Sequence, residues 1–113
     1  MVEHQPSLDS TFGAVSDPTR REILAALTEG ETSVTQLAEP FDVSLQAISK
    51  HIGVLAAAGL VARERRGRVH WCRLEAAPMK AADEWLVGYR DFWDAQLESL
   101  DAYLATGSER GRR

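Results

Sequence analysis

Residues 43–71 read VSLQAISKHIGVLAAAGLVARERRGRVHW, and this stretch decides the fold. Its first half has apolar residues at i, i+4 and i+7, the spacing of one buried helical face: Ile48, Ile52 and Leu55. Ser44 is a suitable N-cap for this helix, and Gly59 is a suitable stop. The pattern therefore predicts a helix over about residues 44–58.

The second half of the stretch changes from a helical to a strand pattern. LVARERRGRVHWCRL, from Leu60 to Leu74, is rich in strand formers and breaks at Gly67. We predict a β-hairpin whose exposed tip is surrounded by arginines, namely Arg65, Arg66 and Arg68. The arginine-rich part of this hairpin covers about residues 63–70.

Two shorter helices are predicted before this stretch. SDPTRREILAALTEGE offers Asp17 as an N-cap and Pro18 at the first helical position. SVTQLAEPFDV starts again at Ser33 and leads into a tight turn at Pro40. The order is helix, turn, helix, and the helix after the turn is basic and polar on its outer face.

The last long segment, PMKAADEWLVGYRDFWDAQLESLDAYLA, has apolar residues at helical spacing from Pro78 onward. It predicts one long amphipathic helix before Gly107. Its aromatic residues present more apolar surface than a small domain covers from within, which favours a partner surface. A stripe packed only against the chain's own core is the alternative. The candidate interface residues are Phe12 from the first helix with Leu86, Tyr89, Trp93, Leu97 and Leu100.

Charge is distributed unevenly along the chain. The net charge is −4, but residues 44–74 carry six Lys or Arg against one Glu. Residues 1–43 carry eight acidic side chains against two arginines, and residues 75–107 carry seven against two basic ones. A local basic segment on an otherwise acidic chain indicates one anion-facing surface. A solvated charged hairpin is the competing interpretation.

Length and composition define the broad class. A chain of 113 residues, 44% hydrophobic and 27% charged, fits one globular domain, which we expect over residues 1–107 with a disordered tail at 108–113. No apolar run is long enough to span a membrane, and the N-terminus has no secretion signal, so we expect a cytoplasmic chain without a membrane partner. The lone Cys72 lies in a predicted strand, and no Ser, His and Asp set or phosphate-binding loop accompanies it in the sequence. This favours a buried strand residue over the nucleophile of an enzyme.

The motifs DPTRREILAAL, LAEPFDVSLQAISKHIGVLAAAGLV and RRGRVHWCRL resemble the ArsR-type family of bacterial transcriptional repressors, over roughly residues 12–104. The resemblance implies a mainly α winged helix-turn-helix with a small β-hairpin and a long C-terminal dimerisation helix. It also implies a homodimer that binds an inverted repeat in an operator. The family's metal sensors use cysteines before the turn, or His with Asp or Glu on the terminal helix. This chain has neither pattern, so it resembles a non-metal-sensing subgroup, for which we expect no metal and no cofactor, and the resemblance names no inducer.

A recognition helix in this position would read double-stranded DNA in the major groove. Gln46 can pair with adenine, Lys50 can reach guanine or a phosphate, and Ser49 is short enough to let the backbone approach. His51 either contacts DNA or packs against the first helices. The predicted DNA-binding residues are Ser44, Gln46, Ala47, Ser49, Lys50 and His51 in the helix, with Arg65, Arg66 and Arg68 in the wing. A winged helix that binds protein instead of DNA is the alternative, against which the basic wing argues.

Overall fold

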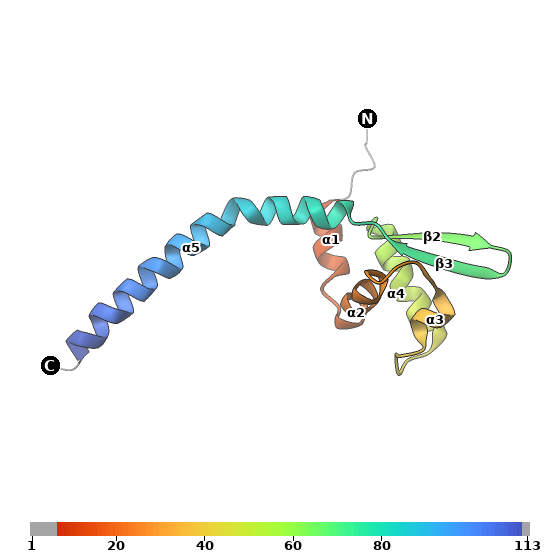
Figure 1. The fold of residues 1–113 in the computed structure, drawn as a ribbon, viewed down its shortest axis with the longest axis horizontal. Coiled ribbons are helices and arrows are strands. Elements are labelled where there is room, and N and C mark those ends of the chain that lie inside the picture. The colour runs from red at the N-terminus through yellow and green to blue at the C-terminus, as the bar shows by residue number, and fades with distance from the viewer. Residues whose placement is uncertain (1–6, 112–113) are drawn as a thin grey trace, which may run out of the picture. The chain divides into compact units, whose positions relative to one another are not determined.

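The computed structural model describes the backbone of residues 7–111 and the side chains of residues 7–106. By its internal contacts the chain divides into two compact units, residues 1–82 and residues 83–113. The elements in chain order are α1 (Leu8–Ala14), α2 (Pro18–Leu27), β1 (Thr32–Ser33), α3 (Val34–Ala38), α4 (Leu45–Ala57), β2 (Val61–Arg66), β3 (Val69–Leu74) and α5 (Ala77–Gly111). Figure 1 labels the five helices and the two longer strands.

Helices α2, α3 and α4 begin where the sequence predicts, whereas the separate helix α1 was not predicted. The Asp17 side chain accepts a hydrogen bond from the backbone N–H of Arg20, with Pro18 as the first residue of α2. The hydroxyls of Ser33 and Ser44 accept equivalent bonds at the starts of α3 and α4. Each cap satisfies a backbone donor that the first helical turn leaves unpaired.

The hairpin belongs to a three-stranded antiparallel sheet of order β1-β3-β2. Strand β1 is only two residues long and pairs with the middle of β3. The sequence pattern does not reveal β1. The turn consists of two residues, because Arg66 pairs with Val69 across it. Gly67 takes a φ of +64° at the first turn position, where a type II′ turn needs glycine.

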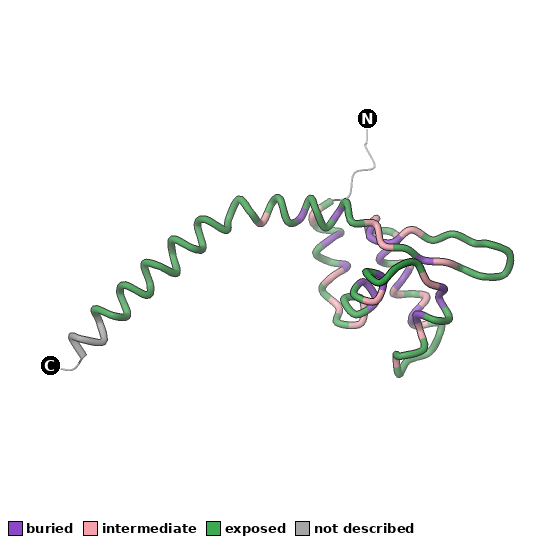
Figure 2. Tube along the Cα trace, viewed as in Figure 1, coloured by how far each residue is buried: buried purple, intermediate pink, exposed green. Residues whose placement is uncertain are grey.

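The core of the first unit lies where the helices α2, α3 and α4 meet the base of the sheet. Figure 2 shows buried residues along these helices and exposed residues along most of the hairpin. The core cluster consists of Ala14, Ile23, Leu24, Leu27, Val34, Leu37, Ile48, Ile52, Leu55, Ala58, Leu60, Val61 and Cys72. The base of the hairpin is thus packed in the core, and its outer part is exposed to solvent.

Helix α5 begins in the first unit and continues through the second. Its backbone is helical as far as Gly111, so it extends past Gly107, where the sequence pattern ends it. The last two positions of the predicted disordered tail, residues 112–113, lie outside the described residues.

Candidate nucleic-acid interface

Helix α4 has one buried face and one exposed polar face. Ile48, Ile52 and Leu55 are each 0% exposed, which fixes the rotation of the helix about its axis. Gln46 and Lys50 lie away from this face and are exposed. Polar side chains in the first turns of the second helix of a helix-turn-helix are those that reach base edges in the major groove. Helix α4 therefore has the buried and polar faces that a recognition helix requires.

Three of the predicted contact residues are small and lie at the start of α4. The Ser44 hydroxyl accepts a hydrogen bond from the backbone N–H of Ala47 at 3.1 Å, so this side chain is already used as the helix cap. Ala47 and Ser49 are half-buried. Their short side chains leave the backbone of the first two turns open to approach, and their contacts with DNA stay predictions.

His51 is turned toward the N-terminal end of α2. Its Nδ1 lies 3.2 Å from Nη1 of Arg20 and 3.9 Å from Oδ2 of Asp17. Arginine is always a donor, so Nδ1 is the acceptor in this contact when it carries no proton. Arg20 also donates from Nε to the carbonyl of Ala14 at 2.7 Å and so joins α1, α2 and α4. This is the packing arrangement that the sequence left open, and a contact of His51 with DNA stays a prediction.

The same cluster perturbs one acidic side chain. The backbone N–H of Arg20 is the largest cause that lowers the pKa of Asp17, and the nearby His51 and Arg20 side chains lower it further. A carboxylate held in its charged form strengthens the cap of α2. The contacts of His51 with Arg20 and Asp17 thus connect the start of α2 to α4, beside the shared core.

The outer part of the wing has two faces of different character. Side chains of paired residues lie on the same face of a sheet. Arg63 pairs with Cys72 and Arg65 with His70, which places Arg63, Arg65 and His70 together on what we call the cationic face. Glu64 pairs with Trp71 and Arg66 with Val69. The side with Glu64, Arg66, Trp71 and Arg73 we call the paired face, because carboxylates compensate its arginines.

Arg66 is the centre of the paired face. Its Nη1 and Nη2 each donate to one oxygen of Glu31 at 3.0 Å, and Nη2 also donates to Glu64 at 2.8 Å. Its Cζ lies 5.5 Å from the centroid of the Trp71 ring. The hydrogen bond from Arg66 holds the pKa of Glu64 below its usual value, and the two carboxylates raise the pKa of Arg66. Arg66 thus ties the wing to the segment before β1, and the phosphate contact predicted for it stays untested.

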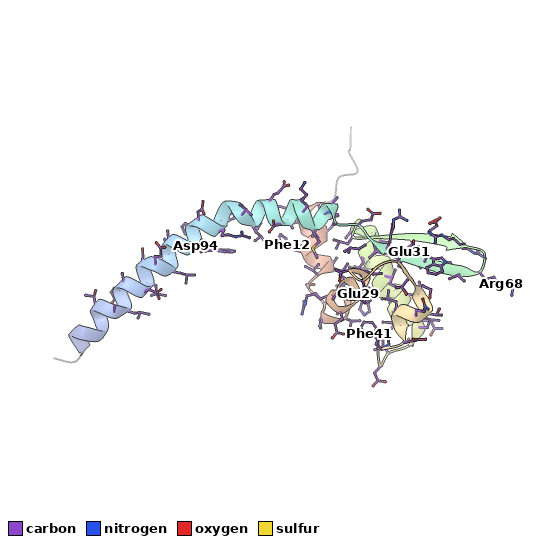
Figure 3. The ribbon with its side chains drawn as sticks, in the orientation of Figure 1. Phe12, Glu29, Glu31, Phe41, Arg68 and Asp94 are labelled. Atoms are coloured by element: carbon purple, nitrogen blue, oxygen red, sulfur yellow. The ribbon has the colours of Figure 1, made fainter. Side chains whose placement is uncertain are left out.

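The other two predicted wing residues lie at the tip of the hairpin. Arg65 donates from Nε to the carbonyl of Gly67 at 2.9 Å, which fixes its side chain along the turn. Arg68 is the second turn residue, and Figure 3 shows it at the end of the hairpin. Both are exposed, as contact with a phosphate requires.

Three polar residues beside this surface were not predicted from the sequence, namely Arg63, His70 and Thr35. The alternation of side chains along VARERR could have indicated Arg63, because it lies two residues before Arg65 and so on the same face. His70 and Thr35 gave no comparable signal, since only the strand register and the packing of α3 bring them to this place.

Helix α5 carries large apolar side chains that are exposed within the second unit. Trp93 is 50% exposed, and Tyr89, Leu97 and Leu100 are similarly open, while Leu86 is half-buried. The rings of Trp85 and Tyr89 lie 5.0 Å apart between centroids, and those of Tyr89 and Trp93 lie 6.5 Å apart. In the first unit, Phe12 is also partly exposed at 36%. An apolar stripe of this size is typical of a protein–protein contact.

Other kinds of site receive no support from residues 7–111. No group of three or more His, Cys, Asp or Glu is placed to hold a metal ion among residues 7–106, whose side chains the structure describes. Within the same residues, no helix is long and apolar enough to cross a membrane. Cys72 is 0% exposed, as predicted for a strand residue, and burial raises the pKa of its thiol. A buried thiol with a raised pKa is a poor nucleophile.

A helix-turn-helix followed by a β-hairpin with exposed arginines defines a winged helix-turn-helix protein, and comparisons with known proteins agree. A family model described as a helix-turn-helix domain matches residues 15–64. The transcriptional repressor SdpR of Bacillus subtilis is 30% identical over 90 residues, which make up 80% of this chain and 100% of that protein.

Solved structures of transcriptional regulators also resemble this chain. The crystal structure of an ArsR family transcriptional regulator matches with a TM-score of 0.73 and 36% identity, covering 83% of this chain and 97% of that one. An ArsR-like transcriptional regulator from a Rhodococcus species matches with a TM-score of 0.66 and 36% identity, covering 85% and 91%. The chain belongs to the ArsR family of transcriptional regulators, which confirms the resemblance found in its sequence. These relatives are regulators and not enzymes, so the prediction of a non-enzymatic chain is also confirmed.

Proposed function

We propose that this chain is a cytoplasmic homodimeric repressor that binds an inverted-repeat operator in double-stranded DNA. The observation that carries the proposal is the exposed polar start of α4 beside the cationic face of the wing. The buried residues Ile48, Ile52 and Leu55 hold α4 so that Gln46 and Lys50 point outward. The similarity to the repressor SdpR supports repression as the outcome of binding.

The two parts of this surface have different tasks. Gln46 is the candidate for bidentate pairing with adenine, and Lys50 is the candidate for guanine or a phosphate. The arginines at the wing tip bind phosphates of the flanking groove, which adds affinity without much choice of sequence. Specificity therefore resides in α4 and salt-dependent affinity resides largely in the wing.

The apolar stripe of α5, with Phe12, forms the two-fold dimer interface in this proposal. An inverted repeat presents the same half-site twice, and a two-fold dimer presents the same helix twice. The exposed aromatic surface on α5 supports this assignment, because apolar area of this kind is stabilised by burial against a partner.

Selection of duplexes from random DNA with the purified chain tests the proposal. We expect an enriched sequence with two inverted half-sites whose centres lie about 34–36 Å apart, one helical turn of DNA. A salt series on the selected duplex should give affinity that falls steeply as salt rises. Failure to enrich any sequence, together with a salt-insensitive contact with a protein, would favour the protein-binding alternative.

A further inference from the structure

A pocket of about 260 Å³ opens between the start of α3, the first turns of α4 and the wing. Five polar side chains from these three elements line it, and three aliphatic side chains complete its walls. The polar ones are Thr35, Ser49, Arg63, Arg68 and His70. Ser49 is the member that belongs to the recognition helix, so the pocket adjoins the surface proposed to read DNA. We call it the anion pocket.

The donors in the anion pocket suit a group with several oxygens and a negative charge. Two guanidinium groups supply permanent charge, two hydroxyls can donate or accept, and an imidazole adds a further ring nitrogen. The pocket lining contains no carboxylate. Charged donors of this kind bind phosphate by short, charge-assisted hydrogen bonds.

Charge compensation differs between the two faces of the same hairpin. On the paired face, Arg66 and Arg73 both have carboxylate partners, at 2.8 Å from Glu64 and 3.2 Å from Glu75 respectively. Within the described residues, Arg63 and Arg68 have no ion pair. The two arginines that line the anion pocket, Arg63 and Arg68, are thus without a carboxylate partner in this part of the chain, as is Arg65 at the tip, and an external anion could balance their charge.

The walls and the size of the anion pocket indicate an ester rather than a bare ion. Its volume of about 260 Å³ is well above the roughly 10–15 Å³ that a single water molecule needs on the same measure. Val34 and Leu45 supply apolar walls, which suit the carbon atoms of a sugar next to the phosphate. The place that a Cβ would take on Gly53 is 3.9 Å from Nη1 of Arg63, so this guanidinium lies along α4.

We propose that the anion pocket binds one phosphate group, with Arg63 and Arg68 as its charged ligands and Thr35, Ser49 and His70 as further hydrogen-bonding partners. The identity of this group rests on the proposed function: it is a backbone phosphate of DNA, which lies between the wing and the DNA groove that α4 reads. Arg63, which lies before the hairpin tip, is then a DNA-binding residue, and Arg66 positions the wing that carries it.

Phosphate binding is tested first without DNA. Inorganic phosphate replaces chloride at constant ionic strength, and the backbone amide resonances of Thr35 and Ser49 are followed by NMR. We expect saturable shifts in the wild type and about tenfold weaker binding in R63Q and R68Q, as for the loss of one charge-assisted hydrogen bond. The matched control is R73Q, on the other face of the hairpin, which should bind as the wild type does. Unchanged spectra away from the pocket show that each variant is folded.

Duplex binding then identifies the source of the phosphate. If the pocket holds a DNA phosphate, R63Q should flatten the slope of log affinity against log salt by about 0.9, and R73Q should leave it unchanged. Saturable phosphate shifts with an unchanged slope would support the pocket but assign it to a free phosphate ester. A wild type that binds duplex without any phosphate shift, and with an unchanged slope in R63Q, would overturn the pocket and leave the proposed function standing. Saturable phosphate shifts in a chain that binds no duplex would support the pocket and reject the proposed function.

Discussion

Truncation of Trp93 is the sharpest test of the proposed dimer. Trp93 is 50% exposed in the single chain, so about half of its surface is available for burial against a second copy. Taking about 250 Å² for a tryptophan side chain, this is roughly 125 Å², or about 3 kcal/mol at 25 cal/mol per Å². Two-fold symmetry removes this contact twice, which gives an upper value of about 6 kcal/mol per dimer.

Side-chain ordering on association offsets part of this free energy, so we expect Trp93→Ala to cost roughly 3–6 kcal/mol of dimer stability. The dimer dissociation constant should then rise by roughly 100-fold to 10,000-fold. Sedimentation velocity over a concentration series measures this change directly. Operator affinity should fall much more than affinity for random duplex, because a monomer presents one recognition helix only.

Val87→Ala is the matched control for this experiment. Val87 is 44% exposed on the same helix, but it lies six residues before Trp93 and so about 120° away around the helix axis. The control should leave the dimer intact. A wild type that is monomeric at micromolar concentration, or equal effects of the two substitutions, would refute the assignment of the stripe.

Four further predictions concern α4 and the wing. Gln46→Ala should cost about 1–3 kcal/mol on the selected operator and little on random duplex in fluorescence anisotropy; equal losses would exclude base reading by this residue. Arg66→Gln should raise the pKa of Glu64 toward its ordinary value of 4.5 in an NMR titration. Because the wild-type pKa of Glu64 is lowered, the ion pair stabilises the fold at pH values above 4.5, and this contribution is lost as the pH falls through the lowered pKa. An unchanged titration curve of Glu64 in Arg66→Gln would contradict the pairing. Gly67→Ala should cost about 1 kcal/mol in urea unfolding, because alanine at a φ of +64° is strained, and equal stability would contradict the turn geometry. Ser44→Ala should cost about 1 kcal/mol by removing the cap of α4, whereas Ser44→Asp should keep the cap and weaken duplex binding; an uncapped but equally stable variant would be the contrary result.

The local parts of the fold are those that the sequence predicts well. Asp17 and Ser44 cap their helices as expected, because a cap involves a side chain and a backbone group three residues apart. The apolar spacing in α4 is equally local. Strand β1 escapes such reasoning, since two residues make no pattern and its pairing with Cys72 connects distant parts of the chain.

In the candidate site, too, local features are predicted from the sequence and contacts between distant residues are not. Gln46 and Lys50 are exposed on α4, as helical periodicity alone indicates. The sequence groups the wing arginines together, but their surroundings differ: Arg66 meets Glu31, 35 residues earlier in the chain, while Arg63 meets no carboxylate among the described residues. Which arginine is compensated depends on strand register and on contacts between distant residues, and neither can be read from composition.

The strand order β1-β3-β2 leaves β2 at the edge of the sheet, with one row of backbone N–H and C=O groups that no neighbouring strand pairs. An open edge is a template on which another chain can add a strand and so begin aggregation. Four of the six residues of β2, RERR at its end, are charged, and like charges on an incoming copy oppose such pairing. The arginines proposed to contact DNA thus also protect the sheet edge. Variants that remove several of them at once should be checked for aggregation by light scattering before any loss of affinity is interpreted.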